Sequence, residues 1–289
     1  MKLQVKFSLI FFLGFGIGLG LAGYICYGIL QKGAREQVAS QARLMMESSL
    51  AARIYTTEQI KPMVDRNDPV FHPQTVPAYA ATEHFNYFRK ANPDYTYKEA
   101  TLNPTNPRDH ATDWEADVVN IFRNDPKKVE FSGERDTPNG RSLYIARPIK
   151  ASMPCLECHS TPRAAPASML KIYGRTNGFG WQPNEIIGAQ IVSVPMALPF
   201  AIANKSFRGL VTSLIVVGFS ILVILNLILY FFVIRPVRRF ALAADEISKG
   251  NLKIQDFPAE GQDEIATLAR SFNRMHRSLE KAMTMLDRR

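Results

Sequence analysis

Residues 209–234 read GLVTSLIVVGFSILVILNLILYFFVI, and this stretch decides how the chain is organised. It contains no charged side chain and exceeds the roughly 20 residues that an α-helix needs to cross the hydrocarbon core of a bilayer. A second run, residues 7–30 (FSLIFFLGFGIGLGLAGYICYGIL), has the same properties. The sequence therefore predicts two transmembrane helices.

Positive charges beside the two helices predict their orientation, because loops rich in Lys and Arg stay on the cytoplasmic side. Lys2 and Lys6 precede the first helix, and Arg235, Arg238 and Arg239 follow the second. No small-x-small cleavage site follows the first helix cleanly, so we interpret it as an uncleaved anchor in a bacterial inner membrane. The predicted segments are cytoplasmic residues 1–6, membrane residues 7–30, periplasmic residues 31–208, membrane residues 209–234 and cytoplasmic residues 235–289.

Charge and membrane motifs indicate the partners. The formal net charge of +9 over 289 residues suits either a nucleic acid or a membrane surface, and the two apolar runs favour membrane lipid and no nucleic acid. Gly14 with Gly18, and Gly16 with Gly20, form GxxxG pairs that allow close helix approach. Asn226 lies deep in the second apolar run, and we expect it to form a hydrogen bond across a helix interface.

Residues 31–208 have the pattern of one α+β domain. We expect a helix that continues the first membrane helix outward and ends or kinks at Pro62, and a second, amphipathic helix over residues 78–92. Residues 95–117 are rich in polar residues and turns, and we interpret them as irregular. Asn139-Gly140 predicts a β-hairpin between two strands, and residues 185–196 predict a third strand.

The stretch PCLECHSTP, residues 154–162, holds two of the three cysteines in the chain. In a c-type cytochrome, two closely spaced cysteines form thioether bonds to the porphyrin, and the next histidine ligates the iron. The pattern therefore predicts one covalently attached haem c, with Cys155 and Cys158 as attachment sites and His159 as the proximal ligand. The predicted periplasmic location fits this chemistry.

The cysteine pair has three alternative uses. A structural zinc site needs two more ligands, and the remaining cysteine, Cys26, lies in a membrane helix. A thioredoxin-like pair begins a helix after a strand, whereas this proline-flanked stretch has the composition of a loop. A disulfide across two residues is strained.

The second axial ligand of the iron has several candidates. Met46 or Met45 on the helix that continues the first membrane span is the tentative distal ligand, because a thioether sulfur is a common sixth ligand. The same methionines at such spacing also suit core packing. Histidines at positions 72, 84 and 110 are alternatives, a vacant or water-bound sixth position remains open, and Arg53, Arg141 and Arg147 are candidate partners for the haem propionates.

The segment after residue 234 contains two seams of apolar residues spaced alternately three and four apart. These seams comprise Val237, Phe240, Ala244 and Ile247, followed by Ile265, Leu268, Phe272, Met275, Leu279, Ala282 and Leu286. Such a and d positions belong to parallel coiled coils and need partner helices. We interpret His276 as a solvent-facing position between seam residues rather than as a phosphoacceptor.

Two resemblances follow from these motifs. Arg235-Pro236, the two seam helices, Gly250 and the Asp263-Glu264-Ile265 connector resemble a HAMP domain, which implies a dimeric parallel four-helix bundle that relays signals. RIYTTEQIKPM (53–63), EATLNPTNPRDHATDWEAD (99–117), YIARPI (144–149), CLECHSTP (155–162) and IIGAQIVSVPM (186–196) resemble the membrane-anchored, PAS-like c-type haem domains of bacterial sensors. That resemblance implies a PAS-like sheet with flanking helices, and haem held by Cys155, Cys158 and His159.

The leading hypothesis is a homodimeric haem sensor, responding to redox state or a small gas, that passes a conformational signal through HAMP. Since no room remains for an output domain after the second seam helix, we expect a separate cytoplasmic output protein. The alternative is a membrane-tethered c-type cytochrome that exchanges electrons with a periplasmic redox partner. No catalytic constellation surrounds the motif, so we do not expect an enzyme.

Overall fold

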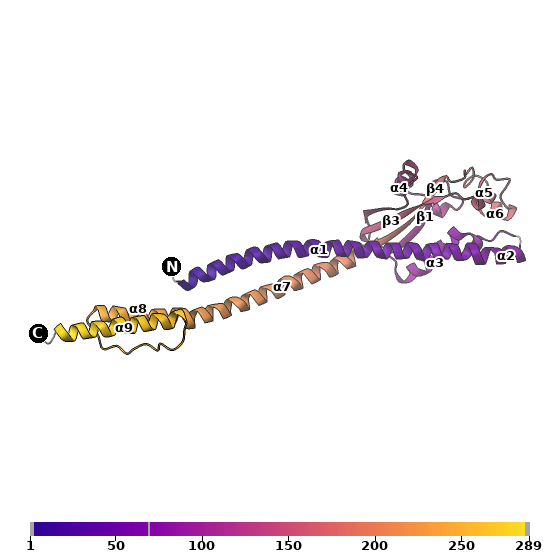
Figure 1. The fold of residues 1–289 in the computed structure, drawn as a ribbon. Coiled ribbons are helices and arrows are strands. Elements are labelled where there is room, and N and C mark those ends of the chain that lie inside the picture. Colours follow the sequence, from indigo (N-terminus) through magenta and orange to yellow (C-terminus); the bar gives the residue numbers. More distant parts are fainter. Residues whose placement is uncertain (1–2, 69, 287–289) are drawn as a thin grey trace. The chain divides into compact units, whose positions relative to one another are not determined.

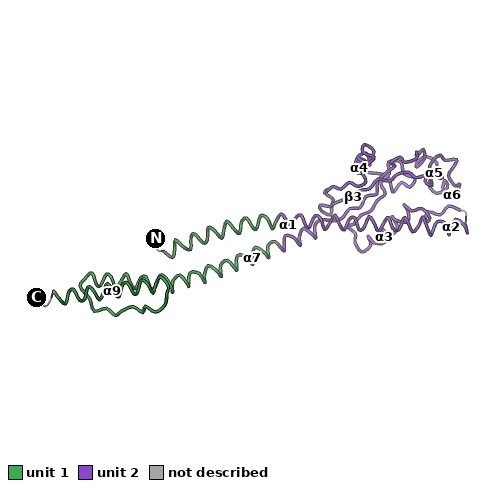
Figure 2. Tube along the Cα trace, viewed as in Figure 1, with its two compact units in different colours: residues 1–27, 207–289 green, residues 28–206 purple. Residues whose placement is uncertain are grey.

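The computed structural model describes residues 3–68 and 70–286 in two compact units. Figure 2 shows the units as Gly28–Ser206 and as Met1–Tyr27 with Phe207–Arg289. Lys2, one of the predicted cytoplasmic cations, residues 287–289 and the side chain of the predicted seam residue Leu286 lie outside the described residues.

The unit Gly28–Ser206 is built on a four-stranded antiparallel sheet (Figure 1). Its strands are β1 (Thr96–Thr101), β2 (Phe131–Thr137), β3 (Gly140–Lys150) and β4 (Ile186–Pro195), in the order β1-β4-β3-β2. The hairpin predicted at Asn139-Gly140 is confirmed, with Thr137 opposite Gly140 at the turn. The strand predicted over residues 185–196 is β4, which lies between β1 and β3.

Helices cover both faces of the sheet. On one face, α1 (Leu3–Tyr55) and α3 (Pro77–Ala91) pack on a cluster that includes Tyr97, Leu143 and Val194. On the other face, α4 (Asp113–Asn124) packs through Val118, Val119 and Phe122 on Ala146, Ala189 and Ile191. The predicted α+β class, a sheet with flanking helices, is confirmed.

The interpretation of residues 95–117 as irregular was wrong. This segment contains β1 and the start of α4. The helix begins because Thr112 and Glu115 form a reciprocal capping box at its N-terminus. In β1 the side chains of Tyr97, Glu99 and Thr101 face the same side of the strand and are all buried, so no alternation of polar and apolar residues marks it.

The helix of the first apolar run continues beyond the predicted break. After α1, a π-helical turn, Thr56–Ile60, leads directly into α2 (Lys61–Asn67), so the helix passes Pro62 and ends at Asn67. A π turn shifts the backbone hydrogen bonds by one residue. Thr56 and Thr57 donate their hydroxyls to the carbonyls of Ala52 and Arg53, at 2.8 and 2.9 Å, which supports the irregular turn.

The remaining short elements precede or follow the sheet strands. They are 3₁₀ turns at Pro73–Thr75 and Pro107–Asp109, and the helices α5 (Met153–His159) and α6 (Ala167–Tyr173), which lie between β3 and β4. After β4, only Met196 separates the sheet from α7 (Ala197–Ile228).

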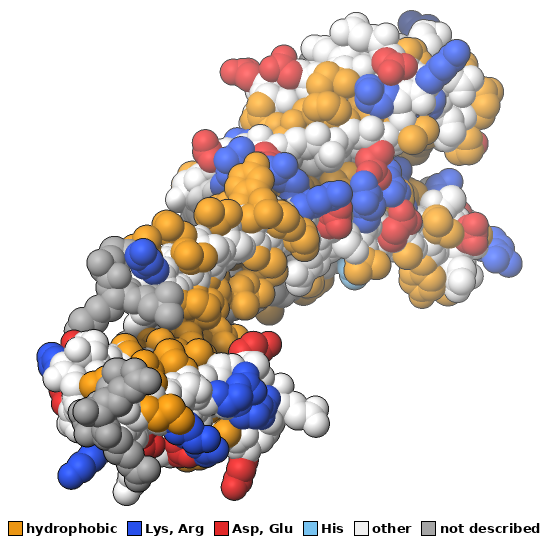
Figure 3. All heavy atoms as spheres, turned by 60° about the vertical axis from the view of Figure 1, so that its left-hand side comes forward, with side chains coloured by type: hydrophobic (Ala, Val, Ile, Leu, Met, Phe, Trp, Pro, Cys, Tyr) orange, Lys and Arg blue, Asp and Glu red, His pale blue; other side chains and the backbone are white. Residues whose placement is uncertain are grey.

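The other unit contains the apolar parts of α1 and α7. Two helical stretches, Gln4–Asn67 and Ala197–Ser248, each include a window long and apolar enough to cross a membrane. Figure 3 shows hydrophobic side chains gathered on the molecular surface. The exposed large apolar residues include many of the two apolar runs, such as Ile17, Leu21, Val216 and Phe219. Ser8 donates a hydrogen bond of 2.9 Å to the Asn226 side chain, so the predicted interhelical bond of Asn226 is confirmed within one chain.

The C-terminal region forms two helices joined by a connector. A second π-helical turn, Leu229–Ile234, leads into α8 (Arg235–Ser248), and α9 (Glu264–Leu286) follows the connector. Phe240, Phe257 and Phe272 form an aromatic cluster between the helices and the connector, with ring centroids 4.4–5.8 Å apart. Several predicted seam residues remain exposed in the single chain, namely Val237, Leu268, Met275 and Leu279.

The interpretation of His276 as solvent-facing was wrong. His276 is buried, and its Nε2 lies 2.8 Å from the Leu252 carbonyl of the connector. Asn273, one turn earlier, both accepts from the Phe257 N–H and donates to the Phe257 carbonyl, at 3.0 and 2.9 Å. This face of α9 holds the connector rather than facing water.

Candidate functional site

The cysteine motif lies on the short helix α5, which corrects the expectation of a loop. Pro154 occupies the first turn of α5, where its missing N–H and fixed φ are compatible with a helix. Within one helix, positions i, i+3 and i+4 share a face. The helix therefore brings Cys155, Cys158 and His159 to one side, which a loop would not guarantee.

Because the motif is helical, its loop-like composition no longer argues against a thioredoxin-like pair. The pKa of Cys158 gives a different argument against such a pair. Burial raises the pKa of the Cys158 thiol, although the Lys61 ammonium lowers it. A reactive thiolate requires a lowered pKa. Neither Cys155 nor Cys158 is in a disulfide. Within residues 3–68 and 70–286, no group of three or more His, Cys, Asp or Glu side chains is arranged to hold a metal ion.

His159 is held by contacts on one ring edge and one face. Its Nδ1 lies 2.7 Å from the carbonyl of Gly178 and 3.2 Å from the hydroxyl of Thr105. Because a carbonyl oxygen only accepts, Nδ1 carries the proton and donates it, which leaves the lone pair on Nε2. The ring of Trp181 stacks on the imidazole with a centroid distance of 4.0 Å and an interplanar angle of 13°. Burial lowers the pKa of His159, which favours the neutral ring that ligates metals.

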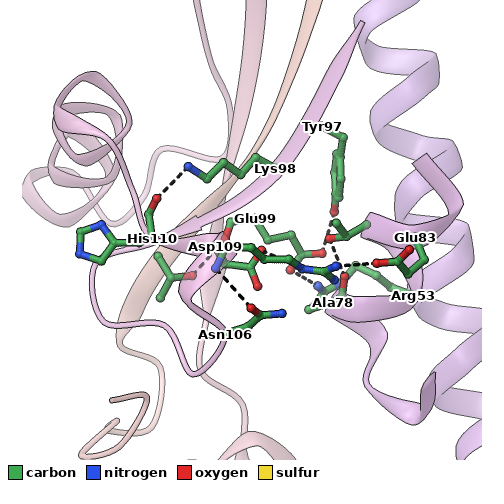
Figure 4. A network of polar contacts seen from close by, with 12 residues as sticks. Arg53, Ala78, Glu83, Tyr97, Lys98, Glu99, Asn106, Asp109 and His110 are labelled. Atoms are coloured by element: carbon green, nitrogen blue, oxygen red, sulfur yellow. Dashed lines mark hydrogen bonds and ion pairs between the residues drawn. The ribbon is translucent and has the colours of Figure 1, made fainter. Parts of the chain in front are cut away.

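The C-terminal end of α1 forms a partly buried ion pair with β1. Arg53 donates to Glu99, and the Tyr97 hydroxyl donates to the other carboxylate oxygen of Glu99 at 2.7 Å (Figure 4). Burial opposes the charge on Arg53, but the Glu99 carboxylate outweighs it, and the pKa of Arg53 is raised.

A second group of charges adjoins this ion pair. Burial raises the pKa of Asp109 to about 6, and Arg108 only partly offsets that effect. Lys98 donates to the carbonyl of His110 at 2.7 Å (Figure 4). It also donates to the Glu115 carboxylate at 2.7 Å. The polar residues of this network are therefore paired, and Asp109 is the carboxyl whose pKa of about 6 lies nearest to neutral pH.

Comparison with known families identifies the domain that holds this site. Residues 31–195, more than half of the chain, match the Tll0287-like family model (Tll0287). The chain belongs to the Tll0287-like family. Residues 229–281 match the HAMP domain model, so the predicted HAMP domain is confirmed and follows the Tll0287-like domain in the same chain.

Similarity to individual proteins is lower. No curated protein matches the chain. Among solved structures, the crystal structure of the cyanobacterial heme-protein Tll0287 is 17% identical, with a TM-score of 0.44, and the match covers 54% of this chain and 94% of that chain.

The Tll0287-like domain does not bring the predicted methionines together with His159. Met46 is fully buried in the cluster that contains Leu143 and Val194, which pair near the start of β3. In contrast, α5 follows the end of β3 at Lys150. Met45 packs at the edge of the same cluster. A methionine ligand therefore stays a prediction, and packing explains the burial of Met46.

The other candidate side chains of the Tll0287-like domain have protein partners or face water. His72 pairs with Asp68 at 2.8 Å, and His110 donates to the Ala111 carbonyl at 2.9 Å. His84 is exposed. The predicted propionate partners Arg141 and Arg147 pair with carboxylates of the protein, Glu134 for Arg141 and both Glu47 and Glu130 for Arg147.

Sequence reasoning missed the residues that surround His159 in the Tll0287-like domain. Gly178, Thr105 and Trp181 come from segments that are 19, 54 and 22 positions away in the chain. The segment with Thr105 was quoted for its resemblance to haem sensors, but without a role. Glu99 was missed for the same reason, since its partner Arg53 lies 46 positions away.

Proposed function

We propose that this chain is a membrane-anchored haem sensor, in which a c-type haem bound to the Tll0287-like domain controls the HAMP domain. The observation that carries the proposal is the order of parts in one chain: a Tll0287-like domain with a Cys-x-x-Cys-His motif, an apolar helix and a HAMP domain. Such an order suits signalling, because a HAMP domain serves to relay a conformational change.

The residues on α5 fit a covalent haem. Cys155 and Cys158 would hold the porphyrin from one helix face, and His159 would offer Nε2 to the iron while Nδ1 donates to Gly178. When bound, the haem supplies an iron whose oxidation state or sixth ligand can change. Whether the input is redox state or a small gas follows from how firmly the sixth position is held.

The cations at the ends of the apolar helices support a cytoplasmic HAMP domain and a periplasmic haem domain. Arg235, Arg238 and Arg239 are exposed directly after the π turn that ends the second apolar helix, and Lys6 precedes the first. Clusters of this kind stay on the cytoplasmic side. We infer a two-pass protein of the bacterial inner membrane, with one haem exposed to the periplasm.

Two connections of the Tll0287-like domain suit the transfer of a signal. Strand β4 is buried along almost its whole length, and only Met196 separates it from α7, so movement of the sheet passes directly into that helix. On the other side, Arg35 and Arg43 of α1 pair with Glu134 and Glu130 at 2.8 and 3.0 Å, which ties α1 to the hairpin region. A relay of this kind needs a bistable element at its end.

The exposed seam residues of α8 and α9 are the surface on which a second copy would dock. Leu268, Met275 and Leu279 lie at a and d positions yet are about two-fifths exposed in the single chain (42%, 46% and 41%). Burial of such residues favours a homodimer. The sensor would then act on a separate cytoplasmic protein that recognises one packing of this bundle.

The test uses cross-linking of the full chain in lipid nanodiscs. Leu279→Cys in a Cys26→Ser background places a thiol in the seam, and a bismaleimide reports dimer geometry through a bond that the haem reductant does not break. We expect the cross-linking rate to differ between oxidised and reduced protein, or with and without carbon monoxide. The matched control is Lys281→Cys, an exposed position outside the seam.

Three outcomes separate the hypotheses. Cys155→Ala with Cys158→Ala should abolish covalent haem, and wild-type protein without covalent haem would contradict the proposal. The cross-linking rate of Leu279→Cys could instead be the same in every haem state, while the protein exchanges electrons rapidly with small carriers. That result would favour the membrane-tethered cytochrome. Loss of the response in His159→Ala, with normal dimerisation, would support the sensor.

A further inference from the structure

The loop that follows β1 lies directly behind the ring of His159. Thr105 places its hydroxyl 3.2 Å from His159 Nδ1, on the same ring edge that the Gly178 carbonyl occupies. Two residues earlier, Asn103 accepts from the Gly178 N–H at 3.0 Å and donates to the Phe179 carbonyl at 3.5 Å. One short segment thus contacts both the ring and the turn that holds it.

The turn at Gly178 is shaped to aim its carbonyl at the ring. Gly178 has a φ of +81°, a conformation that other residues rarely adopt. A Cβ on Gly178 would lie 1.9 Å from the Thr105 hydroxyl and 2.8 Å from the Thr105 backbone. The close approach of these two segments therefore requires a glycine, and Asn103 fixes the turn from its other side.

The plane of the ring is fixed by separate contacts. The indole of Trp181 stacks on the imidazole, and the backbone N–H of Trp181 donates to the His159 carbonyl at 3.3 Å. Gly180 donates to the Ser160 carbonyl at 3.0 Å. Loss of a contact at Nδ1 would therefore alter the hydrogen bond to the ring while the stacked position of His159 is kept.

We propose that Asn103 and Thr105 are positioning residues for His159, which fix its metal-binding tautomer and tune the reduction potential of the haem; this inference rests on the proposed function. The hydrogen on Nδ1 points between the Gly178 carbonyl and the Thr105 hydroxyl, so the lone pair stays on Nε2. Acceptors at Nδ1 increase the basicity of the ligating nitrogen. A more basic ligand stabilises ferric iron, so weaker acceptors raise the potential.

The experiment measures reduction potentials of the full chain in nanodiscs by spectroelectrochemistry, with the iron–histidine stretch recorded by resonance Raman. Thr105→Val removes the hydroxyl at nearly constant shape, whereas Thr105→Ser keeps it. Asn103→Ala releases the turn at Gly178. The matched control is Asn106→Ala in the same loop, since Asn106 caps a different turn by accepting from the Arg108 N–H at 3.2 Å.

We expect Thr105→Val and Asn103→Ala to favour the ferrous state by about tenfold, which for one electron is about 59 mV upward, and to weaken the iron–histidine stretch. Thr105→Ser and Asn106→Ala should match wild type in both readouts. A general loss of stability would affect Asn106→Ala as well and would leave the stretch unchanged. Haem-loaded Thr105→Val and Asn103→Ala with wild-type potentials would overturn the inference, whereas wild-type protein without haem would overturn the proposed function first.

Discussion

Met46 offers a sharp test of whether the core or the cofactor explains a buried methionine. The side chain is fully buried among the apolar residues that join α1 to the sheet, including Leu143 and Val194. Met46→Ala removes three buried heavy atoms, worth about 2.4 kcal/mol at about 0.8 kcal/mol for each CH₂-sized group. The cavity adds to this, and the expected loss is about 2–5 kcal/mol. For a domain of this size, that lowers Tm by roughly 10 °C.

Met46→Leu separates the two explanations, because it keeps the volume and removes the sulfur. If Met46 serves packing, Met46→Leu costs less than about 1.5 kcal/mol and leaves the absorption spectrum of the haem unchanged. The assay combines thermal unfolding with spectra of oxidised, reduced and carbon monoxide-treated protein, and Met45→Leu is the matched control. A change to a high-spin spectrum in Met46→Leu alone would refute the packing explanation and identify Met46 as the distal ligand.

Three further predictions concern charge and the HAMP connector. Burial raises the pKa of Asp109 to about 6, above its unfolded value of 3.8, so the folded domain binds more protons than the unfolded chain between these pH values. The stability of the domain therefore falls as the pH rises from 3.8 to 6, by at most about 3 kcal/mol. Melting temperatures of Asp109→Asn should depend less on pH and be higher than those of wild type at neutral pH, and an equal pH dependence would contradict this. Glu99→Gln leaves the charge of Arg53, whose side chain is only 25% exposed, without its counter-ion and should cost up to about 3 kcal/mol in urea unfolding. Glu134→Gln, whose nearest partners are largely exposed, should cost about 0–1 kcal/mol. Asn273→Ala leaves the N–H and carbonyl of Phe257 without their side-chain partner and should cost about 1–3 kcal/mol. We expect faster proteolysis of residues 249–263 with an unchanged haem spectrum. Unchanged proteolysis would show that the bonds of Asn273 do not hold the connector.

Elements with a local signal could be predicted from the sequence. Asn139-Gly140 marked the β2–β3 hairpin, and the uncharged runs marked the apolar helices. The helix α4 also had a local signal that was overlooked, since Thr112 and Glu115 have capping-box spacing before the apolar Val118. Such signals need no knowledge of the rest of the fold.

Features that depend on distant partners could not be predicted in this way. Glu99 in β1 is a charged residue, and from sequence alone it argues against a buried strand. Its burial is explained only by the ion pair with Arg53, which comes from α1. The spacing of the two cysteines and His159 could be recognised in the sequence. The Gly178 carbonyl and the Thr105 hydroxyl reach the imidazole ring only because their two loops approach within van der Waals contact. The chemistry of the motif was readable, whereas its surroundings depend on the tertiary fold.

The π turn at Thr56–Ile60 has a consequence for chain length. In a continuous α-helix, residues eight apart differ by about 80° around the axis, whereas one extra residue in the turn makes Arg53 and Lys61 equivalent to residues seven apart, within about 20°. A relative one residue shorter here would keep its helix and lose this phase. In an alignment of the family, a gap in this segment would therefore mark a change in which side chains share one face of the helix, not a harmless difference in length.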